Sequence, residues 1–93
     1  LFTSIRVNRL LDHLDNTTLS TTQLGTRLQL RTTELGRFLD ATSRLNITRV
    51  TRGDLVELYW RGRELARTVD ADRRMTVSGL VKELRTSADA GDE

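Results

Sequence analysis

An eight-residue pattern occurs twice in the chain, eleven residues apart, and it limits the fold more than any other feature of the sequence. TTQLGTRL at residues 21–28 returns as TTELGRFL at residues 32–39. Each copy opens with threonines, which favour helix starts, and continues with apolar residues at helical spacing. The two copies predict two short helices joined by a tight turn at residues 29–31. Two copies are too few for a repeat solenoid, which needs at least about three.

The composition indicates one small globular domain without catalytic or metal-binding chemistry. Of the 93 residues, 37% are hydrophobic and 30% are charged, which is enough for a single core. No apolar run approaches the ~18 residues that span a bilayer, so we expect a soluble, cytoplasmic protein. The chain has no Cys and only one histidine, His13. With no nucleophile constellation, Gly-rich phosphate loop or paired carboxylates, we expect no enzyme activity, no metal and no cofactor.

The hydrophobic pattern changes along the chain from helical to alternating and back to helical. An apolar stripe in residues 1–16, at Val7, Leu10, Leu11 and Leu14, predicts a first helix. The repeated pattern predicts helices over 22–29 and 32–44. Residues 47–51 and 55–60 alternate about the turn Arg52-Gly53-Asp54 and predict a β-hairpin.

The helical pattern returns after the hairpin. We expect one helix over 64–69, a charged break at 70–74 and a last helix from Thr76. The predicted fold class is therefore mainly α with a small β-hairpin. We divide the chain into a domain over 1–70, a C-terminal helix over 71–88 and a disordered acidic tail over 89–93.

Residues 23–39 resemble the helix-turn-helix pattern that is common in bacterial and archaeal proteins. Gly25 occupies its small-residue position, where a larger side chain would separate the helices. Gln29 stands where the pattern usually has Gly, and Arg31 stands where it usually has a Ser or Thr cap, so Thr32 is expected to take over the capping. The buried positions of the pattern are filled by Leu24, Leu28, Leu30, Leu35 and Leu39.

The order of the predicted elements, together with WRGRELA at residues 60–66, is similar to winged helix-turn-helix regulators of the multiple-antibiotic-resistance type. That resemblance implies that helix 32–44 reads the major groove of DNA and that the hairpin over 47–60, the wing, contacts flanking DNA. Arg37 is the expected base reader, through guanine O6 and N7. The expected DNA contacts are Arg31, Thr32, Thr33, Gly36, Arg37, Arg44, Arg49 and Arg52.

The distribution of charge agrees with a nucleic-acid partner better than the net charge does. The whole chain has 15 basic and 13 acidic residues, a formal charge of +2. Residues 27–52 contain six arginines and two acidic residues, which is a local charge of +4. We expect Asp40, which phosphate would repel, to lie near the groove rim or to pair with Arg44.

The last helix carries a strong apolar stripe that either folds onto its own domain or pairs with a second copy. We expect the second arrangement, a homodimer that reads an inverted repeat with half-sites about 34 Å apart. The stripe consists of Val77, Leu80, Val81 and Leu84.

The predicted function is a sequence-specific, double-stranded-DNA-binding transcriptional regulator of a prokaryote, and more specifically a repressor. Its expected location is cytoplasmic and nucleoid-associated. Two alternatives stay open: a winged-helix module that binds another protein, and an architectural or plasmid-maintenance protein that coats DNA with little sequence preference. No small-molecule effector can be inferred from the sequence.

Overall fold

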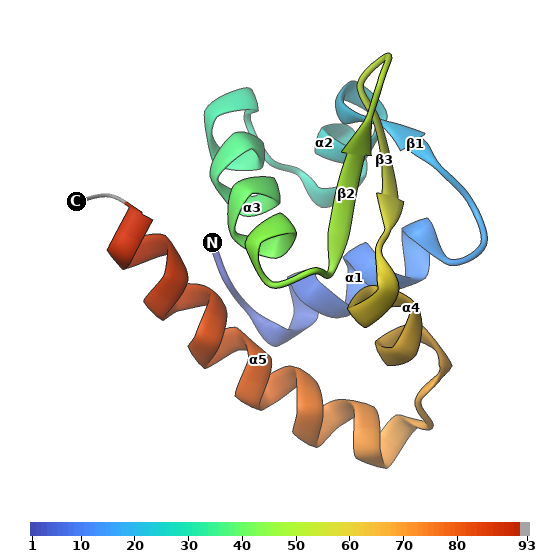
Figure 1. Cartoon of the computed structure of the whole chain (residues 1–93), viewed down its shortest axis with the longest axis vertical. Coiled ribbons are helices and arrows are strands. Elements are labelled where there is room, and N and C mark those ends of the chain that lie inside the picture. Colours follow the sequence, from blue (N-terminus) through green and yellow to red (C-terminus); the bar gives the residue numbers. More distant parts are fainter. Residues whose placement is uncertain (92–93) are drawn as a thin grey trace.

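The computed structural model describes residues 1–91 and confirms a mainly helical domain with a small antiparallel sheet (Figure 1). Within these residues, five helices pack around a three-stranded sheet. No helix in this range is long and apolar enough to cross a membrane. In chain order the elements are α1 (Ser4–Leu14), β1 (Leu19–Ser20), α2 (Thr21–Leu28), α3 (Thr32–Arg44), β2 (Thr48–Thr51), β3 (Leu55–Leu58), α4 (Trp60–Arg67) and α5 (Asp70–Gly91).

The sheet consists of the predicted hairpin and one short strand that the sequence did not predict. The strand order is β1-β3-β2, and both pairs are antiparallel. Gly53 and Asp54 both have positive φ, 85° and 59°, which places the tight turn between β2 and β3 where it was expected. The missed strand β1 has only two residues, too few for an alternating pattern to be visible.

The two copies of the repeated pattern form α2 and α3, which begin at equivalent positions. Ser20 caps α2: its hydroxyl accepts a hydrogen bond from the Gln23 N–H, and the Gln23 side chain accepts one from the Ser20 N–H. At the start of α3 only the second half of this arrangement is present, because an arginine side chain has no acceptor; the Glu34 carboxylate accepts from the Arg31 N–H at 3.1 Å. The prediction that Thr32 caps this helix is wrong, since Thr32 is its first residue.

The turn between α2 and α3 follows the helix-turn-helix pattern despite its departures. Gln29 adopts the left-handed conformation, with φ 56° and ψ 44°, that glycine usually supplies. A Cβ added at Gly25 would lie 3.3 Å from Leu35 Cδ2. The close approach of α3 to α2 therefore depends on a small residue at this position, as predicted.

The junction between α3 and the sheet is buried and closely packed. The Thr42 and Thr48 hydroxyls share a hydrogen bond of 2.8 Å inside the core. The Ile47 carbonyl accepts from the Tyr59 N–H, and a Cβ at Gly62 would stand 2.1 Å from that carbonyl oxygen. Strand β2 and helix α4 are thus both fixed to the end of α3.

Helix α5 differs from the prediction at both ends. The stretch expected to be a charged break, residues 70–74, is its first turn, where Asp70 and Asp72 complement the positive end of the helix dipole. Arg73 ties this end to α1 through hydrogen bonds to Asn8 and Asp12. Residues 89–91, predicted to be a disordered tail, belong to the helix, and residues 92–93 of that prediction lie outside the described residues.

The apolar stripe of α5 is part of the core of a single chain. Val77, Leu80, Val81 and Leu84 are at most 5% exposed because they pack against α1 and α3. The prediction that they form a dimer seam is therefore wrong: an amphipathic stripe shows that a face is covered but not by which partner. Residues 71–88 are helical, as predicted, within α5.

We predict that Gly62→Ala unfolds or severely destabilises the protein, whereas Gly36→Ala stabilises it. The added methyl at Gly62 would collide with a backbone carbonyl, and we expect the free energy of unfolding to fall by about 3 kcal/mol or more. At Gly36, a helix position with open space around a Cβ, alanine should raise it by about 0.5–1 kcal/mol. Urea unfolding followed by circular dichroism measures both changes. If both variants changed the free energy of unfolding by similarly small amounts, the close packing at Gly62 would be contradicted.

A second prediction separates a core role for Leu84 from a role between subunits. Leu84→Ala should lower the free energy of unfolding by about 2–4 kcal/mol, because it leaves a cavity in the core of one chain. Any dependence of the unfolding midpoint on protein concentration should be the same in both proteins. If the unfolding midpoint rises with protein concentration in the parent chain but not in the Leu84→Ala variant, Leu84 lies in a subunit interface.

Candidate nucleic-acid interface

The first two turns of α3 present an exposed polar surface, and the opposite face of the helix packs into the core. Leu35, Phe38, Leu39 and Thr42 face the core, and Phe38 is fully buried. The exposed residues of these turns are Arg31, Thr32, Thr33, Glu34, Gly36 and Arg37. All five of the predicted contacts in this segment are therefore accessible.

The tip of the hairpin is tied to the same end of the molecule. The Thr21 N–H, at the start of α2, donates to the Asp54 carbonyl at 3.0 Å. In Figure 1, the hairpin tip and the first turn of α3 project from one end of the molecule, away from α5. Arg52 is exposed at this tip, and in the described part of the chain its side chain has no ion-pair partner.

A surface hollow of about 640 Å³ lies between α2 and α3. The first residues of both helices line it, and so does Gln29, the C-cap of α2, so the hollow meets the positive end of α3 and both ends of α2. Sequence reasoning did not count Thr21 and Thr22 as contacts, although the Ser20 cap before them could have suggested it. The hollow is lined by Thr21, Thr22, Gly25, Thr26, Gln29, Leu30, Arg31, Thr32, Leu35, Gly36 and Leu39.

Arg37 and Arg44 lie at a second hollow, of about 250 Å³, where α3 meets the end of α5. Arg44 Nη1 donates to the Ser87 carbonyl at 3.2 Å. Asp40 lines the same hollow, but the predicted Asp40–Arg44 ion pair is not among those of residues 1–91. Arg44 is thus partly engaged within the protein, and Arg37 stands at the border between α5 and the exposed face.

The sequence analysis expected Arg49 to contact DNA as part of the wing, but Arg49 lies within β2 and not at the hairpin tip. It faces Glu57 across β2 and β3, and its Nη2 lies 2.5 Å from the Glu57 carboxylate. Its guanidinium also stacks over the Tyr59 ring, with 5.3 Å to the centroid. The Arg49 side chain therefore contacts Glu57 and Tyr59 on the sheet, and Arg52 is the predicted cation at the hairpin tip.

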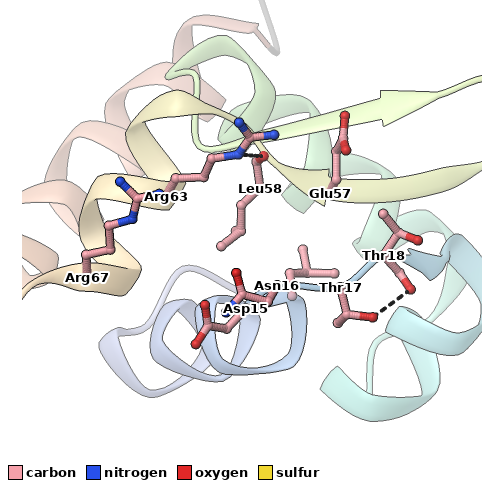
Figure 2. Close-up of a pocket in the computed structure, with 9 residues that line it drawn as sticks. Asp15, Asn16, Thr17, Thr18, Glu57, Leu58, Arg63 and Arg67 are labelled. Carbon is pink, nitrogen blue, oxygen red and sulfur yellow. Dashed lines mark hydrogen bonds between the residues drawn. The ribbon is translucent and has the colours of Figure 1, made fainter.

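A third hollow, of about 390 Å³, opens between α4 and the loop after α1 (Figure 2). Arg63 and Arg67 stand on one wall, and the Arg63 Nε donates to the Leu58 carbonyl at 3.2 Å. Asp15 supplies an opposing charge, and α1 and α4 both end here, each helix end being equivalent to about half a negative charge. The two arginines are therefore offset, and the hollow has no excess positive charge with which to attract an anion.

Other chemistry receives no support from the side chains in residues 1–91. In that range, no three His, Asp or Glu side chains come together in a way that could hold a metal ion. Comparison of the chain with protein-family models, curated proteins and solved structures gave no match.

Proposed function

We propose that this chain binds double-stranded DNA as a winged helix-turn-helix transcriptional regulator, with α3 in the major groove and the β2–β3 hairpin as the wing. The observation that carries the proposal is the exposure of the first two turns of α3 at the same end of the molecule as the hairpin tip (Figure 1). A recognition helix of this class contacts base edges with its N-terminal residues.

The arrangement of the elements supports the winged form of the motif. Helices α2 and α3 meet across Gly25 and the left-handed Gln29, and the three-stranded sheet follows with strand order β1-β3-β2. The hairpin extends directly from the end of α3. A wing placed in this way reaches DNA that flanks the segment read by the helix.

The side chains of this surface divide into two roles. Thr32, Thr33 and Arg37 are proposed to contact bases, and Gly36 lets the helix backbone approach the groove closely. Arg31 and Arg52 are proposed to contact phosphates, together with the start of α2. Phosphate contacts supply affinity, and the α3 contacts supply sequence preference.

The homodimer and the inverted repeat stay predictions, and the proposed DNA contacts require neither of them. Since the α5 stripe is buried, a dimer would need a different surface. Repression, by covering a promoter, and a nucleoid-associated location in the cytoplasm would follow from DNA binding and belong to the same proposal.

Fluorescence anisotropy of a labelled random 20-base-pair duplex, titrated at several salt concentrations, tests the proposal. We expect binding that weakens with salt, with a slope of log K against log salt of about −2 to −4, because a few phosphates are neutralised. Selection from a pool of random duplexes should recover a preferred sequence. Salt-dependent binding without a preferred sequence would support an architectural protein instead, and no binding by the folded chain at low salt would refute DNA binding.

Two arginine variants and a matched control assign the roles within the same experiment. Arg37→Ala should weaken binding to the selected sequence by about 1–3 kcal/mol and relax base preference. Arg52→Ala should weaken all sequences equally and reduce the salt slope by roughly one unit. Arg9→Ala removes the same charge from an exposed position on α1 and should change little. Equal losses in all three variants would mean that only net charge matters.

A further inference from the structure

The end of α5 lies against the part of α3 that carries Arg37 and Arg44. The Arg44 guanidinium donates to the Ser87 carbonyl, and the hollow that both arginines line is closed on its other side by Ala88 and Asp89. Figure 1 shows α5 running beneath the domain and ending beside α3. Arg37, from the proposed DNA surface, and Arg44, a DNA contact expected from the sequence, therefore lie beside the last turns of α5.

This end of α5 is negative for two reasons that add together. The final carbonyls of a helix are equivalent to about half a negative charge, and the last turn has no basic residue to offset them. Asp89 adds a full charge at the hollow, and the sequence continues with Asp92 and Glu93.

Asp89 does not form a close ion pair with either arginine in the described residues. Asp89 nevertheless lines the same hollow as both arginines, and the Ser87 carbonyl already accepts a hydrogen bond from Arg44. Negative groups in this position repel a DNA phosphate. They also offset part of the positive charge of the guanidinium groups that would attract it.

We propose that the acidic end of α5 is a built-in competitor of the DNA backbone for Arg37 and Arg44. It lowers affinity for DNA of any sequence. This inference rests on the proposed function, because it regulates the same surface.

Two double variants test the proposal. Asp89→Asn with Asp92→Asn and Asp70→Asn with Asp72→Asn each raise the net charge of the chain by two. Asp89 lines the hollow beside α3, and Asp92 follows it in the sequence, whereas Asp70 and Asp72 lie in the first turn of α5. The probe is the labelled random 20-base-pair duplex at low salt, and circular dichroism confirms that each variant is folded.

We expect Asp89→Asn with Asp92→Asn to tighten binding at least about threefold and the distal pair to change it less than about twofold. Equal tightening by both pairs, or no tightening by the first pair, would refute the proposed competition while leaving the proposal of DNA binding intact. Tightening by the first pair alone, even from a parent chain that binds too weakly to detect, would support it. No binding by the parent or by either folded variant would refute the proposed function and the inference together.

Discussion

The packing of residue 47 at the junction of α3, the sheet and α4 is the constraint on which the other parts of the structure depend. The Ile47 side chain is fully buried, its N–H donates to the Thr42 carbonyl, and its own carbonyl accepts from Tyr59. Only a glycine at position 62 can approach that carbonyl as closely as α4 does. The buried hydrogen bond between Thr42 and Thr48 joins α3 to β2 at the same point. Because α3 and the hairpin are fixed to each other here, their exposed ends keep a constant separation, which a surface that binds a regular helix such as DNA requires.

The elements that the sequence predicted well are those that local rules determine. Helix α3 was predicted over 32–44 and occupies Thr32–Arg44, because its apolar period, its preceding turn and its following strand all agree. The turn at Gly53 was predicted because glycine and aspartate favour the positive φ that a tight turn between two strands requires. The start of α5 at Asp70 could not be predicted locally, since a run of charged residues there is helical only through contacts such as Arg73 with Asp12. The stripe around Leu84 was predicted correctly as apolar, but a periodic pattern does not identify what covers it.

The candidate site was predictable in its helix and less so in its arginines. Arg31 and Arg37 are exposed on α3 as the helical period required. Arg49 was misplaced because its pairing with Glu57 depends on the register of two strands, which alternation alone does not give. The hydrogen bond from Arg44 to the Ser87 carbonyl could not be predicted, because the two residues are 43 positions apart in the sequence. Arginine side chains are long, and their partners are set by tertiary structure more than by position in an element.

The central claim, that the exposed start of α3 and the hairpin tip form one DNA-binding surface, is tested most directly by mapping it residue by residue. Amide proton and nitrogen chemical shifts of the isotope-labelled chain, followed during titration with a short duplex at low salt, give this map. The account predicts that the largest changes fall within residues 31–37 and 52–54, with smaller changes at the start of α2. Changes concentrated around Arg63 and Arg67, or no changes at all in the folded chain, would contradict it.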